Sequence, residues 1–244
     1  MTPTENFITH LIELRNRLLR IVVGFFIAFV AFFPFANEIY ALLAEPLLSK
    51  LPAGGQMIAT AVTTPFFVPM KVAMMAAFLV SLPHSLYQLW AFIAPGLYVH
   101  EKKFMIPAVV ASSLLFLSGM AFAYFLVFPV IFGFIVGTAP AGVVVMTDIS
   151  SYLDFVITLF FAFGLAFEVP IAVVIAVRLG WVSIKSLREG RGYVIVGAFI
   201  IGAIFTPPDI ISQFMLAIPM WLLYEIGIVT ASFMVPENNT IRSI

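Results

Sequence analysis

Residues 155–177 form one run, FVITLFFAFGLAFEVPIAVVIAV, in which Glu168 is the only ionisable side chain. At about 1.5 Å per residue, a helix of this length crosses a hydrocarbon core of about 30 Å, so we predict a membrane-spanning helix. A carboxylate at such depth costs roughly 2.5–3.5 kcal/mol, so Glu168 is expected to face protein or water. One interpretation is a structural glutamate bonded to a neighbouring helix; the other, which the pattern favours, is a functional group.

The composition extends this prediction to the whole chain. Hydrophobic residues make up 63% and charged residues 10% of the sequence, against roughly 45–50% and 25% in soluble proteins. We therefore predict an all-α, polytopic membrane protein in which residues 1–244 form a single membrane domain.

Several function classes are disfavoured by what the sequence lacks. The formal net charge is zero and cysteine is absent, so we expect neither nucleic-acid binding nor disulfides and thiolate metal sites. The three histidines form no close ligand pair, and no Gly-rich phosphate loop or G-x-S-x-G sequence occurs. We predict no metal, no cofactor and no enzymatic activity.

Uncharged stretches predict six spans, near residues 18–36, 70–93, 104–128, 152–177, 193–206 and 210–226. The uncharged stretch 104–147 is long enough for two crossings. Proline and glycine residues in its second half, from Pro129 onward, indicate a broken loop, so we expect one crossing.

The basic residues support the same choice. A single crossing leaves only Lys50 and Lys71 on one side. The residues on the other side are Arg15, Arg17, Arg20, Lys102, Lys103, Arg178, Lys185, Arg188, Arg191 and Arg242. Because basic residues favour the cytoplasmic side, both termini are predicted there. Residues 94–103 and 178–192 are also predicted to be cytoplasmic, with 38–64 and 129–151 on the far side.

The last two spans are predicted to be short. Before Asp209 the fifth span has about 16 uncharged residues, roughly 24 Å of helix, which is less than the hydrocarbon thickness. Pro207 and Pro208 lack backbone donors, so TPPD predicts a tight turn. Asp209 then caps the final helix, and capping alone is enough to explain an aspartate there.

Two amphipathic segments are predicted to lie at the membrane surface. The N-terminal one starts at a capping box, residues 2–5, and is expected to lie on the cytoplasmic face before the first span turns inward. The second, residues 37–50, carries apolar residues at helical spacing and is expected to be interrupted at Pro46.

Two carboxylates lie among basic residues in predicted cytoplasmic segments. Glu13 lies beside Arg15 and Arg17, and Glu101 precedes Lys102 and Lys103. Each carboxylate either pairs only with its neighbours, a surface contact worth about 0–1 kcal/mol, or serves as a binding group.

Long ordered strings carry a family resemblance: HLIELRNRLLR, SLPHSLYQLWAFIAPGLYVHEKKF, SGMAFAYFLVFPVIFGF, SYLDFVITLFFAFGLAFEVPI and GAFIIGAIFTPPDIISQFMLAIPMWLLYEIG. The chain resembles the TatC family, the multi-spanning subunit of the twin-arginine protein translocase, over residues 6–227. The resemblance implies six transmembrane helices in a concave, glove-like bundle in the cytoplasmic (inner) membrane. It also implies binding of twin-arginine signal peptides of folded cargo, TatA- and TatB-type single-span partners, use of the proton-motive force, and self-association.

Site residues follow from the matching positions. Glu13 and Glu101 match the signal-peptide-binding carboxylates of the family, and a carboxylate fits a guanidinium fork better than a lysine ammonium. The residues expected to shape that pocket are Arg15, Phe92, Pro95 and Leu97. Glu168 is expected to line the hollow of the bundle. Thr206 and Gln213 match positions near a partner helix, although Ala203 departs from the polar or bulkier residue usual beside them.

Two other function classes stay open at this level. A proton-coupled secondary transporter would also need an intramembrane glutamate beside a proline, although no internal repeat is found. A purely structural membrane scaffold is the third. Binding of a twin-arginine peptide separates the receptor from both alternatives.

Overall fold

The computed structural model describes residues 3–51, 55–93, 105–138, 146–205 and 210–234, most of which are helical. The chain divides into two compact units. Unit 1 comprises Met1–Glu45, Met57–Leu114 and Thr147–Leu153, and unit 2 comprises Pro46–Gln56, Leu115–Met146 and Asp154–Ile244.

Five stretches of the described residues are long and apolar enough to cross a membrane: Ile8–Leu48, Thr64–Phe92, Ile106–Gly137, Ile149–Arg178 and Ile210–Met234. A shorter apolar helix lies at Arg191–Phe205. The all-α membrane fold class is confirmed, and these stretches are consistent with six spans in the predicted order.

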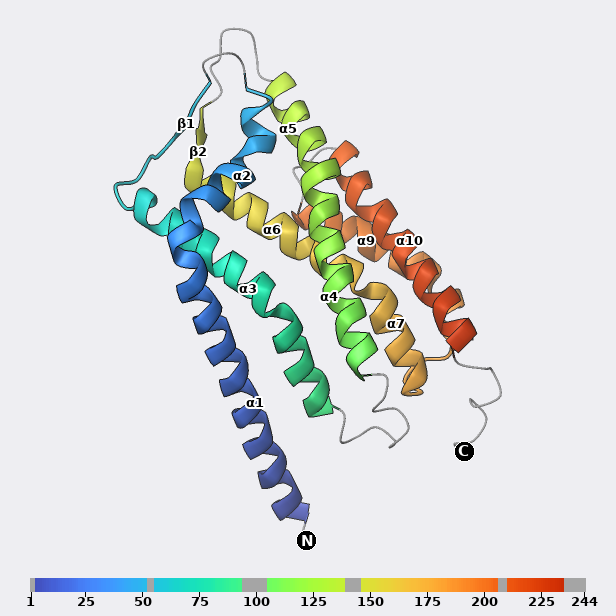
Figure 1. The fold of residues 1–244 in the computed structure, drawn as a ribbon. Helices are drawn as coiled ribbons and strands as arrows, with labels where there is room; N and C mark the ends of the chain where they lie inside the picture. Colours follow the sequence, from blue (N-terminus) through green and yellow to red (C-terminus); the bar gives the residue numbers. More distant parts are fainter. Residues whose placement is uncertain (1–2, 52–54, 94–104, 139–145, 206–209, 235–244) are drawn as a thin grey trace. The chain divides into compact units, whose positions relative to one another are not determined.

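Helices α1 (Pro3–Phe32) and α3 (Thr64–Ile93) of unit 1 lie side by side (Figure 1). Gly24 of α1 permits a close approach, because a Cβ atom built there would lie 3.0 Å from His84 Cδ2. Nε2 of His84 also lies 3.2 Å from the backbone oxygen of Arg20. The histidine therefore ties α3 to the backbone of α1.

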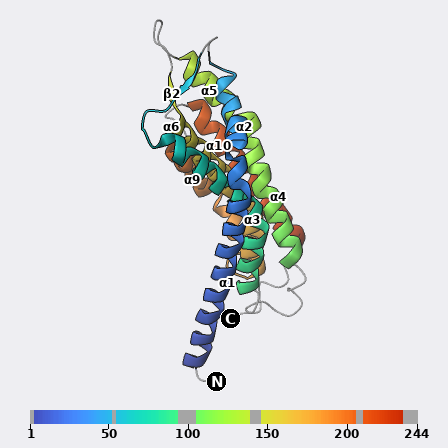
Figure 2. The same ribbon diagram turned by 60° about the vertical axis from the view of Figure 1, so that its left-hand side comes forward.

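The N-terminal amphipathic helix continues into the first span as predicted, but the predicted turn between the two is wrong. Helix α1 runs without a break from Pro3 to Phe32 and is straight in both views (Figures 1 and 2). No proline or glycine lies between residues 4 and 23, so nothing in the sequence breaks the helical hydrogen-bond ladder between the amphipathic part and the span. The amphipathic segment is the first part of the spanning helix.

A short 3-10 turn, η1 (Phe33–Phe35), separates α1 from α2 (Ala36–Leu48), and its central residue is Pro34. The predicted helix near 37–50 is confirmed, but the predicted interruption at Pro46 is wrong, because α2 continues to Leu48. A proline this close to a helix end removes a single ladder hydrogen bond, which the last turn tolerates.

A two-stranded parallel sheet joins distant parts of unit 1: β1 (Met57–Ile58) pairs with β2 (Thr147–Asp148). Nearby, the hydroxyl of Tyr152 donates to the backbone oxygen of Leu43 at 2.6 Å. These contacts connect the loop after α2 to the start of the fourth predicted span.

In unit 2 the third predicted span is longer than expected. Helix α4 (Met105–Phe122) begins in unit 1 and continues through a π-helical turn, η4 (Ala123–Val127), into α5 (Phe128–Gly137). The prediction of a broken loop directly from Pro129 is therefore wrong up to Gly137. Pro129 lies in the first turn of α5, where the missing N–H is tolerated, and the wider π turn precedes it.

The fourth predicted span is two helices, α6 (Ile149–Phe167) and α7 (Val169–Arg178), which meet at Glu168. Pro170 lies in the first turn of α7 and cannot donate to the carbonyl four residues earlier. The uninterrupted helix predicted at 152–177 is therefore wrong at one residue. After α7, Gly180 adopts a φ of 70°, the left-handed conformation common just past a helix end.

Three helices complete unit 2: α8 (Ile184–Glu189), α9 (Arg191–Phe205) and α10 (Ile210–Met234). Helix α9 has 15 residues, so the predicted short fifth span is confirmed. Helix α10 has 25 residues, so the prediction that the last helix is also short is wrong. The helix continues past the predicted end at residue 226, and Glu225 within it pairs with Arg191 at 2.7 Å.

Helices α7 and α10 pack together in unit 2. A Cβ built on Gly227 would lie 3.0 Å from both Pro170 Cα and Val173 Cβ. Tyr224 and Ile228 are buried in the same cluster. The absence of a side chain at Gly227 thus lets α10 approach the start of α7 directly.

Candidate functional site

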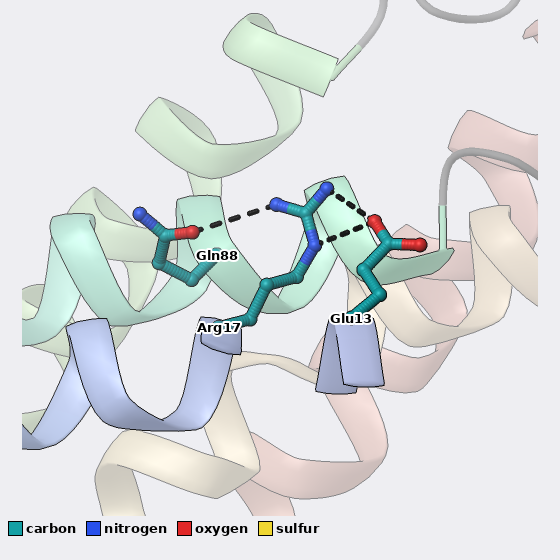
Figure 3. Close-up of polar contacts among 3 residues, drawn as sticks. All are labelled: Glu13, Arg17 and Gln88. Carbon is teal, nitrogen blue, oxygen red and sulfur yellow. Dashed lines mark hydrogen bonds and ion pairs between the residues drawn. The ribbon is translucent and has the colours of Figure 1, made fainter. Parts of the chain in front are cut away.

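The carboxylate of Glu13 is held by an arginine one helical turn along α1. Arg17 donates from Nη2 and Nε to Oε1 of Glu13, at 2.6 and 2.9 Å (Figure 3). The third contact reaches α3, where Nη1 of Arg17 lies 3.5 Å from Oε1 of Gln88. Gln88 is only 6% exposed, so this long contact links the arginine to a buried amide of α3.

An aromatic pair lies on the same two helices, closer to the N-terminus of α1. The rings of His10 and Phe92 stack with centroids 4.4 Å apart and an interplanar angle of 19°. By contrast, Arg15 is exposed and its Nη2 donates to Oδ1 of Asn16 at 3.2 Å. The structure thus brings Glu13 and Phe92 onto neighbouring helices and directs Arg15 to a local contact.

Three residues of this site escaped the sequence analysis as site members: Arg17, Gln88 and His10. The spacing of Glu13 and Arg17, four residues apart on a helix, already signals an ion pair. No comparable sequence signal marks Gln88, which is distant in the chain. The remaining predicted pocket residues, Pro95, Leu97 and Glu101, lie outside the described residues.

Glu168 lies at the junction of α6 and α7. Its backbone N–H donates to Leu165 at 3.1 Å and its carbonyl accepts from Ala172 at 3.0 Å, so the main chain stays paired across the break. The side chain is partly buried. A carboxylate at a helix interruption in a membrane span has the setting expected of a functional group.

Gln213 connects the last two helices. Its Nε2 donates to the backbone oxygen of Phe199 at 3.0 Å, and a Cβ built on Gly202 would lie 3.1 Å from its Cγ. The amide therefore joins α10 to α9. The other predicted residues of this region, Thr206, Pro207, Pro208 and Asp209, lie outside the described residues.

A polar clasp fixes the two-stranded sheet of unit 1. Oδ2 of Asp148 accepts hydrogen bonds from Thr60 N and Oγ1 at 3.0 and 2.8 Å. Oδ1 accepts from the backbone N–H groups of Ser150 and Ser151 at the start of α6. The hydrogen bond from Ser151 N–H, followed by those from Thr60, holds the pKa of Asp148 well below its usual range.

Among the described residues, no group of three or more His, Asp or Glu side chains is placed to hold a metal ion. Between α1 and α3 the described polar groups in contact are the carboxylate of Glu13, the guanidinium of Arg17 and the amide of Gln88.

A family model described as Sec-independent protein translocase protein (TatC) matches residues 9–219. The chain belongs to the TatC family. The TatC of Escherichia coli strain K12 is 53% identical over 235 residues, which cover 96% of this chain and 91% of that protein. The TatC of Haemophilus influenzae is 51% identical over 236 residues, covering 97% and 92% of the two chains.

Solved TatC structures agree with the sequence relatives. A crystal structure of the twin-arginine translocase receptor TatC in DDM superimposes with a TM-score of 0.80 at 39% identity, covering 91% of this chain and 99% of that one. A second crystal structure of the same receptor gives a TM-score of 0.78 at 38% identity.

Membership of the TatC family identifies the chain as a multi-pass membrane subunit of the Sec-independent protein translocase, a component of protein transport. The family assignment decides against the secondary transporter and the purely structural scaffold as primary functions.

Proposed function

We propose that the chain is the receptor subunit that binds twin-arginine signal peptides at the cytoplasmic face of the inner membrane, with both termini in the cytoplasm. Glu13 and Glu101 supply the two carboxylates, and Arg15, Phe92, Pro95 and Leu97 shape the pocket. Bound cargo is then exported in the folded state at the expense of the proton-motive force.

The guanidinium contact that Glu13 already makes carries this proposal. Two nitrogens of Arg17 lie 2.6 and 2.9 Å from one carboxylate oxygen, and this pairing supports the proposal that Glu13 binds a planar guanidinium. Charge-assisted contacts of this kind are among the stronger hydrogen bonds in proteins. A lysine ammonium cannot reproduce the paired donors, so the site favours arginine over lysine.

Peptide binding to the full chain in lipid nanodiscs tests the receptor role. Glu13→Gln combined with Glu101→Gln should weaken binding of a fluorescent twin-arginine peptide, since each charge-assisted hydrogen bond contributes roughly 1.5–3 kcal/mol. Glu38→Gln, on the predicted far side, is the matched control. Unchanged affinity in the double variant would remove these residues from the site.

We assign Glu168 a role after cargo docking. A lipid-facing ionised glutamate would lose several kcal/mol, whereas one facing water or polar groups need not. Glu168→Ala should therefore allow insertion but impair transport, and Glu168→Gln should be milder because it keeps hydrogen-bonding capacity. Wild-type transport by Glu168→Ala in inverted membrane vesicles would leave the residue a structural role.

Single-span subunits of the TatA and TatB type are the proposed partners, with contacts near Thr206 and Gln213. Small polar groups between apolar helices stabilise such contacts by about 0.6–2 kcal/mol each. Self-association of the chain belongs to the same proposal. We assign the chain no catalytic activity and no cofactor. Photo-crosslinkers at exposed Ile210 and Phe214 should capture a single-span partner; no partner adduct in native membranes would contradict this placement.

The orientation rests on the ten-to-two distribution of basic residues. Because the chain contains no cysteine, single introduced thiols report directly on sidedness. An impermeant reagent added outside intact cells should label Val62→Cys, which is 99% exposed in the structure, and should spare Ser186→Cys. The reverse labelling pattern would show that the topology is opposite to the proposed one.

A further inference from the structure

The proposed arginine-binding carboxylate is already occupied by an arginine of the same chain. Both donors of Arg17 converge on Oε1 of Glu13, at 2.6 and 2.9 Å, and Figure 3 shows the second carboxylate oxygen turned away from the guanidinium. The side chains of Arg17 and Glu13 are 20% and 33% exposed. An incoming guanidinium would meet a carboxylate that is partly neutralised.

The geometry also provides a second acceptor for the guanidinium of Arg17. Nη1 of Arg17 lies 3.5 Å from the side-chain oxygen of Gln88, at the long end of hydrogen-bond distances. Gln88 is buried on α3, so its amide stays in place when Glu13 is engaged elsewhere. A small movement of Arg17 toward α3 would shorten this contact and release the carboxylate.

We propose that Arg17 is an internal competitor for Glu13, which a signal-peptide arginine must displace, and that Gln88 holds the displaced guanidinium. The inference rests on the proposed receptor function of Glu13. It adds a step that sets affinity, because every ligand of Glu13 must displace a two-donor contact that has already formed. The apparent affinity for every ligand of Glu13 equals its intrinsic affinity multiplied by the fraction of chains in which the carboxylate is free.

The two possible roles of Arg17, competing for Glu13 or only orienting it, predict opposite changes in peptide affinity when Arg17 is removed. Since the competitor acts before any ligand binds, its removal raises the affinity for twin-arginine and twin-lysine peptides by the same factor. An arginine that only orients Glu13 would instead lower affinity when removed.

The test uses the full chain in nanodiscs and fluorescent twin-arginine and twin-lysine peptides. Arg17→Gln should tighten both by about two- to fivefold, the range that a partly exposed ion pair supports. Arg17→Lys, which keeps the charge but donates through one nitrogen, should tighten both by less. Arg20→Gln makes the same charge change one turn along α1 and should leave affinity unchanged.

Gln88→Leu tests the second half of the proposal. Without its acceptor on α3, Arg17 should stay longer on Glu13, so peptide affinity should fall. In the Arg17→Gln background the same substitution should have no further effect, because such a cycle isolates the coupling between the two residues. A thermal unfolding scan of each variant confirms that the helix pair is intact.

Unchanged or weakened peptide binding in Arg17→Gln would overturn the competitor role, as would unequal factors for the two peptides. Failure of the receptor function itself gives a different result, since Glu13→Gln would then leave peptide affinity at the wild-type level. A Gln88→Leu effect that persists without Arg17 would remove Gln88 from the mechanism.

Discussion

Gly119 on α4 is a position where a single methyl group is expected to disrupt packing in unit 2. A Cβ built there would overlap the backbone oxygen of Phe163 on α6 and would lie 2.9 Å from its carbonyl carbon. It would also lie 3.0 Å from Cγ of Phe167. Phe163 is fully buried and the overlapping atoms belong to the backbone, so a change of side-chain rotamer does not relieve the contact.

The magnitude follows from two opposing terms. Overpacking a tight contact typically costs about 1–3 kcal/mol, whereas alanine in place of glycine within a helix gains up to about 1 kcal/mol. Gly119→Ala should therefore destabilise the protein by about 1–2 kcal/mol. Gly133 on α5 has no atom within 4 Å of a built Cβ, so Gly133→Ala should keep the helix gain without the clash.

Thermal unfolding in detergent, followed by the fluorescence of the three tryptophans, measures the difference. The midpoint of Gly119→Ala should fall by several degrees, since about 1 kcal/mol corresponds to roughly 2–4 °C for a chain of this size. The midpoint of Gly133→Ala should stay the same or rise. Equal midpoints for Gly119→Ala and the wild type would refute the close approach of α4 and α6.

Four further variants test three contacts described above. Asp148→Asn should lower the melting temperature equally at pH 7 and pH 5. The native pKa of Asp148 is depressed, so the ionised carboxylate keeps its full stabilising effect above its usual pKa near 3.9. That effect is lost only as the pH falls through the lower native pKa. A smaller difference at pH 5 would count against the clasp. Gln213→Leu removes the 3.0 Å hydrogen bond to Phe199 and should cost about 1 kcal/mol of unfolding free energy, with an unchanged midpoint as the contrary result. Arg191→Gln and Glu225→Gln should show a coupling of about 0.5–1 kcal/mol in a double-mutant cycle of thermal stability, whereas strictly additive effects would mean that their 2.7 Å contact is not stabilising.

The order of the spans was predictable because hydrocarbon thickness converts directly into a run of uncharged residues. Helix ends were less predictable because a charge does not always end a helix. The last span was predicted to end near residue 226, yet α10 continues to Met234, with Glu225 paired to Arg191 inside the helix. Pro129 indicated a loop, yet the π-helical turn before it lets the helix continue.

The candidate site was predictable to the extent that its residues are close in sequence. Glu13 and Arg17 are spaced for contact on one helix, whereas Gln88 reaches Arg17 only because α3 packs on α1. The stacking of His10 on Phe92 likewise depends on the register of the two helices. The break at Glu168 had a local signal in Pro170, which the length of the apolar run outweighed in the prediction.

The pairing of β1 with β2 constrains the order in which the chain is assembled. Thr60 and Asp148 are 88 residues apart, so during synthesis the first strand must wait until α3, α4 and α5 have followed it. A nascent chain that ends before residue 147 has no partner for β1, and ring closure over this length carries an entropic cost that only the finished sheet offsets. The clasp is thus a late event of biogenesis, and its formation marks a chain in which the intervening helices have already been synthesised.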